Sequence, residues 1–365
     1  MFSVRDIDIL RLICWCQCIG YDDLQSLFTK AEIESMVQLR LVKRYAKSRA
    51  YTVTGKGLSF LRAVLPGGIP ELTLSYHEYA RQRRLRLSRM TLTAYHAGID
   101  VFLNDPSHLS RSPSLFLSAI SRSRGSNPWG STRIAALAHL GGAVYALHYV
   151  CSDIGKIALT DELATFSNQT ALLRGRSRAF IFAGESYRDI LTELDHVYDI
   201  DDRRLSSYGE AYREIQLPVH LLSCDNTGAL QLRLMALPDY RQRLTMAALK
   251  DLFVPPPPEL PDCDALFQGS PFIMAADMDL RRIERLIWSA QRCGYTQIAI
   301  AALEGQAEAV LYERYRDTGK ARVFSLTEEA LASIVRTAPL LYTPANTQYV
   351  TDEGGVLDVS AIKTG

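Results

Sequence analysis

The stretch from Thr29 to Gly57 constrains the fold of this 365-residue chain more than any other. Thr29 and Glu32 form a T-x-x-E capping box, in which each side chain satisfies the other's free backbone N–H, so the sequence predicts a helix that begins there. Two short runs, 41–46 and 50–54, then flank a polar, basic turn, which is the pattern of a β-hairpin with cations at its tip. A short helix followed by a basic hairpin is typical of the second half of a winged helix-turn-helix.

The preceding residues supply the first half of that fold. Residues 4–17 carry apolar side chains at close to the helical period, and 21–28 form a second short helix after Gly20. We therefore expect a winged helix-turn-helix over residues 1–64, with its third helix in the major groove and its hairpin along the phosphates. The predicted DNA contacts here are Lys30, Ser35, Gln38, Arg40, Lys43, Arg44, Lys47, Arg49 and Lys56, with Lys30, Ser35 and Gln38 nearest to the bases.

Two acidic residues oppose this interpretation. Glu32 and Glu34 lie on the helix that is expected to enter the groove, where they repel phosphates. Winged helices also serve as protein docks. The sequence therefore leaves a second interpretation open, in which the hairpin binds a protein such as a relaxase and the chain acts as an adaptor.

Charge is distributed unevenly along the chain. Residues 1–97 contain 15 Lys and Arg against 8 Asp and Glu, whereas the other 268 residues contain 26 against 32. A basic first third beside an acidic remainder indicates that only the first third meets a polyanion.

A second basic segment follows the linker 66–70. Residues 72–103 have the pattern of one long helix that connects the first unit to the next, and arginines cluster along it. Such a cluster is either a solvated helix face or a second phosphate contact. The predicted contacts here are Arg83 and Arg84.

The next segment, 104–253, is expected to form one domain. Residues 104–130 are rich in Ser, Arg and Pro and indicate a loop, and Gly141-Gly142 is a hairpin signal. The expected elements are strands 133–140, 143–151 and 156–160, a helix to 173, strand 178–183, helix 186–196, strands 217–222 and 229–236, and helix 238–253. The long helix before these elements, the first three strands, the helix to 173 and strand 178–183 follow the order of the αβββαβ core of a restriction-endonuclease-like domain, which we therefore predict.

An active nuclease of that fold needs an Asp on the second strand and an E-x-K or D-x-K on the third, so that two carboxylates hold Mg²⁺. The strands expected here, AVYALHYVC and KIALT, contain no carboxylate. Asp153, Asp161 and Glu162 lie nearby at the wrong spacing, and they are the residues that a metal-dependent nuclease would have to use. We expect a non-catalytic domain with no enzymatic activity, no cofactor and no metal.

Four consecutive prolines, 255–258, predict a stiff linker over 254–270. Strands and helices alternate beyond it, which predicts a small parallel α/β domain over 271–336 and an extended tail over 337–365. Asp277, Asp279 and Glu304 follow strands in this domain, where acids either bind a metal or cap the next helix. We expect capping, above all by Asp279.

Seven cysteines in no regular framework favour a reducing compartment. Cys14, Cys16 and Cys18 do not match zinc-site spacing and are expected to fill the core. The sequence shows neither a signal peptide nor an apolar run long enough to span a membrane, so we expect a cytoplasmic protein.

Several short motifs, taken in order, resemble the replication-relaxation family, winged-helix proteins of plasmids and integrative conjugative elements. They are VRDIDILRLI at the start, YTVTGKGLSFL after the hairpin, RLSRMTLTAYHAGIDVF in the long helix, Ser131-Thr-Arg133 with Ala143-Val-Tyr145, and RAFIFAGES. The resemblance covers roughly residues 1–250. It implies a DNA-binding protein of a mobile genetic element that acts in transcriptional control, plasmid replication or conjugation. A homodimer is expected, because one wing reads few base pairs.

Overall fold

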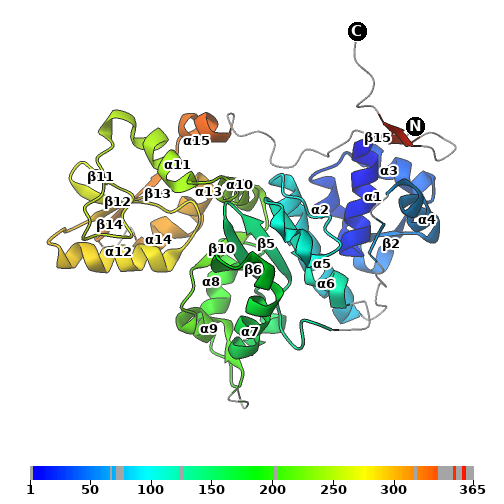
Figure 1. Ribbon diagram of the computed structural model, residues 1–365, viewed down its shortest axis with the longest axis horizontal. Coiled ribbons are helices and arrows are strands. Elements are labelled where there is room, and N and C mark those ends of the chain that lie inside the picture. The colour runs from blue at the N-terminus through cyan, green and yellow to red at the C-terminus, as the bar shows by residue number, and fades with distance from the viewer. Residues whose placement is uncertain are drawn as a thin grey trace, which may run out of the picture.

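The computed structural model shows a mixed α/β fold with several separate sheets. It describes residues 3–65, 68–70, 78–122, 127–200, 202, 204–315, 319–335, 348–350 and 356–358. Figure 1 shows three groups of elements in a row along the longest axis: an N-terminal unit in blue, a central unit in green and a C-terminal unit in yellow and orange. Helix α5 (Glu78–His96) lies between the first two units. No described helix is both long and apolar enough to cross a membrane.

The N-terminal unit contains a three-stranded antiparallel sheet of order β1-β3-β2 packed with four helices. The capping box predicted at Thr29 and Glu32 is confirmed and begins α3. The hairpin is confirmed as well, with the one-turn helix η1 (Ala46–Ser48) at its tip. The elements are α1 (Val4–Cys16), β1 (Ile19–Gly20), α2 (Tyr21–Gln25), α3 (Lys30–Gln38), β2 (Val42–Tyr45), β3 (Ala50–Val53) and α4 (Gly55–Val64).

Apolar side chains of α1 and α3 form the core of this unit. Ile9, Leu10 and Ile13 from α1 are fully buried beside Ile33 of α3. The prediction for the three closely spaced thiols is confirmed, since Cys14, Cys16 and Cys18 are buried and unpaired. Burial raises the pKa of the Cys16 thiol to about 12.

The long connecting helix is shorter than the sequence predicted. It ends at His96, because Gly98 takes a left-handed φ of +81° and turns the chain. Residues 97–103, expected to be helical, form a turn and an extended segment that bridges to Ser114 at Asp100. Residues 71–77 lie outside the described part of the chain.

The central sheet has five strands in the order β10-β8-β6-β5-β4. Neighbours among β4, β5 and β6 are antiparallel, whereas β6, β8 and β10 run parallel. Its strands are β4 (Ser114–Leu117), β5 (Ala136–Leu140), β6 (Ala143–Tyr149), β8 (Ser177–Gly184) and β10 (Val219–Ser223). The helices of this region are α6 (Ser118–Arg122), α7 (Leu159–Gln169), α8 (Tyr187–Asp195), α9 (Tyr208–Glu214) and α10 (Asn226–Met235).

Three predictions for this unit are wrong. Residues 104–130 are not simply a loop, because they contain β4 and α6. The strand expected at 156–160 shrinks to β7 (Lys156–Ile157), which pairs with β9 (Ser206–Ser207) outside the main sheet. The strand expected at 229–236 is helix α10, because Asp225 caps it by accepting a hydrogen bond from the backbone N–H of Gly228.

The C-terminal unit has a four-stranded sheet of order β11-β12-β13-β14, in which the last three strands are parallel, as predicted. The predicted linker 254–270 is wrong in part, since it contains β11 and Val254 bridges to Leu266. The elements are β11 (Ala265–Phe267), β12 (Ser270–Met274), α12 (Leu280–Arg292), β13 (Ile298–Ala302), α13 (Glu304–Gln306), α14 (Tyr312–Tyr315), β14 (Ala321–Ser325) and α15 (Glu328–Val335). In the tail, the described strands β15 (Gln348–Val350) and β16 (Val356–Asp358) pair antiparallel.

Helix α11 (Tyr240–Leu249) corrects the predicted boundary between these units. It was expected to close the central domain, yet it packs against β12 and α15 of the C-terminal sheet. Leu244 and Leu249 share a core with Phe272 and Met274. The prolines at 255–258 therefore lie within the C-terminal unit and do not mark its boundary.

A buried polar network joins the central and C-terminal units. Gln231 of α10 donates to the carbonyls of Leu221 and Asp277 at 2.8 and 3.0 Å. Its Oε1 accepts from Tyr187 Oη at 2.6 Å and from Gln306 Nε2 at 3.0 Å. Because both glutamine side chains are fully buried and satisfied, this network fixes the relative position of the two units.

Candidate nucleic-acid interface

Helix α3 presents several of the predicted contacts on one exposed side. Lys30, Gln38 and Arg40 are exposed, and Ser35 is half-buried. Arg40 follows the helix with a left-handed φ of 58°, which directs the chain from α3 into β2. The structure thus keeps these four predicted residues along one short helix and its end.

The carboxylate of Glu32, the first of the two opposing acids, pairs with an arginine of the same unit. Arg5 of α1 donates from Nε to its carboxylate at 2.5 Å and from Nη2 to the carbonyl of Leu27 at 2.6 Å. Burial raises the pKa of Glu32, but hydrogen bonds from the Thr29 cap and from Arg5 outweigh burial and hold that pKa below its usual value. The negative charge of Glu32 is therefore offset by a cation of the same unit.

Glu34, the second opposing acid, forms an ion pair with Arg44 of β2. Both side chains are partly exposed, at 28% for Glu34 and 46% for Arg44. The pair offsets the second acid of α3. It also engages Arg44, one of the predicted phosphate ligands, within the protein itself.

The hairpin tip carries Lys47 in η1 and Arg49 just after it, as the sequence predicted. Arg49 has a left-handed φ of 46° and an ion pair with Asp22 at 3.3 Å. Both members of that pair are highly exposed, so the pair contributes little and can open when a phosphate approaches.

Two further lysines of the hairpin region differ in their surroundings. Lys43 is exposed on β2, whereas Lys56 donates to the carbonyl of Leu39 at 3.1 Å and so caps the end of α3. Within the described ranges, four of the predicted cations on α3, its end and the hairpin have side chains that make no hydrogen bond or ion pair with another residue. They are Lys30, Arg40, Lys43 and Lys47.

The hairpin is braced against the start of α5. The guanidinium of Arg81 stacks on the ring of Tyr45 at 4.5 Å and also pairs with Glu78. The Arg81 side chain is only 5% exposed. This arginine of the basic cluster therefore supports the hairpin and does not face solvent.

Arg84, another predicted phosphate contact, is half-buried on α5. Burial of part of its side chain, together with the guanidinium of Arg83, lowers the pKa of Arg84 to about 10. The thiols of Cys16 and Cys18 lie close enough to act on it electrostatically. Arg84 therefore belongs to the contact between α5 and the N-terminal unit, whereas Arg83 lines a surface cleft that is described below.

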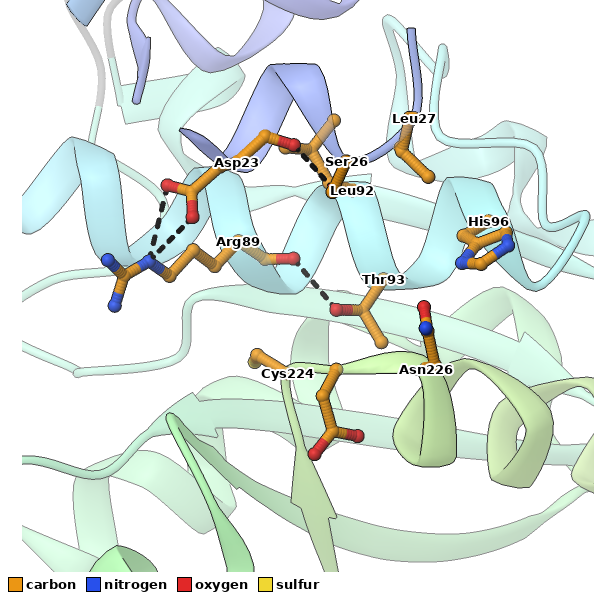
Figure 2. A pocket seen from close by; sticks show the side chains of 10 residues that line it. Asp23, Ser26, Leu27, Arg89, Leu92, Thr93, His96, Cys224 and Asn226 are labelled. Carbon is orange, nitrogen blue, oxygen red and sulfur yellow. Dashed lines mark hydrogen bonds and ion pairs between the residues drawn. The ribbon is translucent and has the colours of Figure 1, made fainter. Parts of the chain in front are cut away.

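Figure 2 shows how α5 also holds α2. Arg89 donates from Nε to both carboxylate oxygens of Asp23 at 3.1 and 3.2 Å, and from Nη1 to Glu185 at 2.9 Å. Asp23 and Arg89 border a small cavity of about 60 Å³ that Cys224 and Asn226 close from the central unit. The ion pairs attach the candidate interface firmly to the central sheet.

The three acids of the alternative nuclease interpretation do not converge. Glu162 is fully buried and accepts hydrogen bonds from the Arg133 N–H at 2.6 Å and from His148 at 3.0 Å. Asp153 pairs with Arg86, and Asp161 is exposed on α7. No group of three His, Cys, Asp or Glu residues that could hold a metal occurs among the described residues.

The acids of the C-terminal unit have structural roles. Asp279 caps α12 by accepting from the Arg282 N–H at 3.1 Å, which confirms the prediction. Asp277 is fully buried and accepts from Tyr240 Oη at 2.6 Å and from Arg241 Nε at 2.8 Å. Glu304 is exposed in the first turn of α13.

A cavity of about 630 Å³ has no counterpart in the sequence analysis. It lies between the Gly141 end of the central sheet and α11, and polar side chains from both units reach it. Among them are Tyr145, His220, Tyr240, Arg241 and Gln242. No local signal points to this cavity, because it exists only where α11 leaves the central unit.

A comparison with protein-family models, with curated proteins and with solved structures found no match to this chain.

Proposed function

We propose that the protein binds duplex DNA through α3 and the β2–β3 hairpin, in the manner of a winged helix-turn-helix. The observation that carries this proposal is the pairing of both α3 acids. Glu32 and Glu34 are offset by Arg5 and Arg44, while four cations of the same surface stay unpaired among the described residues. Residues 29–57 contain seven Lys and Arg against two Asp and Glu. This surface therefore carries the positive charge that phosphates require.

The order of elements supports the arrangement of helices and hairpin that such proteins use. Three helices precede a two-stranded hairpin, and β1 adds a third strand beside β3. The helix before the hairpin is the one that enters the major groove in this class. Its exposed polar residues, Lys30, Ser35 and Gln38, are the proposed base contacts.

The central unit is proposed to be a restriction-endonuclease-like sheet without a catalytic site. Helix α5, the meander β4-β5-β6, helix α7 and strand β8 follow the order αβββαβ, although the first strand is β4 and not the strand that the sequence indicated. The second and third strands, ALAHL and AVYALHY, contain neither a carboxylate nor a lysine.

The resemblance to the replication-relaxation family extends this proposal to a mobile genetic element, with a role in its transcription, replication or transfer. A homodimer would place two α3 helices on one DNA site and so lengthen the sequence that is contacted. Seven cysteines without a disulfide suit a reducing compartment, so we place the protein in the cytoplasm.

The test is fluorescence anisotropy of a labelled random duplex over a salt series. We expect log affinity to fall linearly with log salt, and the slope to decrease by about two in Lys43→Ala/Lys47→Ala because two phosphate contacts are lost. The control is Arg243→Ala, which removes an exposed cation from α11. Equal slopes in all three proteins would remove the hairpin from the interface, and no binding at low salt would favour the adaptor function.

A further inference from the structure

A cleft on the surface of the central unit gathers cations from distant parts of the chain. Its lining comes from α5, from the residues just before β5, from the end of β6 and from α9. Three arginines and two tyrosines line it, and none of the lining residues that the structure describes is a carboxylate. The lining residues are Arg83, Arg86, Leu87, Arg133, Ala135, Tyr149 and Tyr208.

Tyr208, at the inner side of this cleft, has an unsatisfied hydroxyl. The side chain is fully buried, and its Oη makes no hydrogen bond with the described residues. Its ring is held by edge contacts with Phe182 at 5.5 Å and His148 at 6.2 Å between centroids. A buried hydroxyl without a partner destabilises a protein, so its presence calls for a ligand or another explanation.

Charges of both signs act on this hydroxyl, with Glu162 on one side and the guanidiniums of Arg133 and Arg83 on the other. Arg133 is exposed, and its guanidinium makes no hydrogen bond or ion pair with another described residue. The two nearby acids are engaged, Asp153 by Arg86 and Glu162 by His148 and the Arg133 N–H. The exposed guanidinium of Arg133 therefore remains available to an anion that enters the cleft.

The positive charge of Arg83 also acts on a neighbouring arginine, Arg122. The guanidinium of Arg122 donates to the carbonyls of Gly130 and Thr132. Burial, followed by the positive charge of Arg83, lowers the pKa of Arg122 to about 10. The cleft is thus a region where a further anion is favoured.

The cleft also occupies a distinctive place on the sheet. Ala135 immediately precedes β5 and its N–H donates to the carbonyl of Leu147 on β6 at 2.7 Å, while Tyr149 ends β6. These are the second and third strands of the meander, which carry the metal-binding carboxylates in an αβββαβ nuclease. Here the same strands border cations and phenols.

We propose that this cleft binds a phosphoryl group directly, without a metal. One oxygen accepts from the Tyr208 hydroxyl and others accept from the guanidiniums of Arg133 and Arg83. The inner hollow of about 10 Å³ has room for one oxygen-sized group, and the whole recess with its open mouth measures about 310 Å³. The recess therefore suits a terminal or bridging phosphate and leaves no room for a buried base.

The carrier of the phosphoryl group is either duplex DNA or a free anion such as a nucleotide phosphate. In the first case the inference deepens the proposed function, because it adds a second phosphate contact outside the hairpin. The phosphoryl site itself does not depend on that function. The two can fail separately, since hairpin variants and cleft variants alter different surfaces.

Titration calorimetry with inorganic pyrophosphate tests the site. We expect Tyr208→Phe and Arg133→Ala each to weaken binding by about tenfold, the effect of losing one hydrogen bond to a charged group. The matched controls lie on the same helix as Tyr208. Tyr212→Phe removes another unsatisfied hydroxyl away from the cleft, and Arg213→Ala removes another exposed cation. Both are expected to bind as the wild type does.

Failure of the wild type to bind pyrophosphate would overturn the inference, as would equal binding by Tyr208→Phe, Arg133→Ala and the controls. Thermal unfolding of each variant checks that it is folded. Duplex anisotropy of the same variants then identifies the carrier. A salt slope lower by about one in Arg133→Ala assigns the site to DNA phosphate, whereas an unchanged slope with weakened pyrophosphate binding assigns it to a free anion.

Discussion

Replacing Glu34 by glutamine should increase the DNA affinity of this protein. Glu34 pairs with Arg44 across the gap between α3 and β2, and both lie on the proposed interface. Glutamine keeps the length and the helix propensity of glutamate but removes its charge. The substitution therefore removes a charge that repels phosphates and releases a guanidinium that attracts them.

The partial exposure of the pair sets the size of each effect. An ion pair with 28% and 46% exposed partners contributes at most about 1 kcal/mol to folding, so the variant should unfold at nearly the wild-type urea concentration. For DNA, one added hydrogen bond to a charged group contributes about 1.5 kcal/mol, which is roughly tenfold in Kd. One added phosphate contact also steepens the slope of log affinity against log salt by about 0.9. Between 50 and 200 mM salt the variant should therefore lose about 3.5-fold more affinity than the wild type loses.

The assay is duplex anisotropy at several salt concentrations, with two controls. Glu284→Gln breaks a similar exposed pair, with Arg314 at 2.8 Å, in the C-terminal unit and should leave DNA binding unchanged. Glu34→Gln/Arg44→Ala should lose the added slope, since the released guanidinium is gone. If Glu34→Gln and Glu284→Gln bind DNA alike, Arg44 does not face the phosphates and the proposed orientation of α3 is wrong.

Three further predictions concern stability. Gln231→Leu should lower the free energy of unfolding by about 3 kcal/mol in urea titrations, because it leaves Tyr187, Gln306 and two carbonyls short of partners. The control Gln242→Leu alters an exposed glutamine and should change the free energy of unfolding little. Equal losses in the two variants would contradict the network. Burial raises the pKa of Asp277, but the positive charges of Arg241 and His220 outweigh burial and hold that pKa well below its usual value. The ionised Asp277 therefore stabilises the protein above about pH 4, and this contribution declines as pH falls further. Asp277→Asn should therefore cost about 3 kcal/mol at pH 7 and make the loss of stability in acid less steep; a pH profile parallel to that of the wild type would refute this. Gly57→Ala should destabilise the N-terminal unit by about 2 kcal/mol in thermal unfolding, because an added Cβ would lie 2.3 Å from the carbonyl oxygen of Leu41, whereas the open Gly55 should tolerate alanine.

Signals that act within a few residues were predicted well. The box of Thr29 and Glu32 and the cap at Asp279 each depend on side chains that bond to their own neighbouring backbone, and the basic turn at Lys47 follows from residue identity and short-range spacing. The C-terminal strands and helices were also found, because apolar runs alternate there with strongly amphipathic helices. The position of such elements depends little on the rest of the chain.

Elements that depend on distant partners were predicted poorly. Residues 229–236 alternate in a way that suits either a strand or a helix, and the cap at Asp225 decided for the helix. The two-residue strand at Lys156 pairs with Ser207, 51 residues away, and not with the sheet beside it. Helix α11 has the composition of a domain-closing helix, yet its partners lie beyond the prolines.

The same division applies to the candidate sites. The sequence by itself determined the cations of the hairpin, the capped helix before it and the absence of carboxylates from the central strands, since these follow from residue identity and short-range spacing. Only the tertiary structure decided that Glu34 engages Arg44, that Arg81 is buried against Tyr45 and that Tyr208 meets Arg133 in one cleft. The reason is physical: an ion pair or a cleft depends on which faces of distant elements pack together, and that choice minimises free energy over the whole chain and not within any one segment.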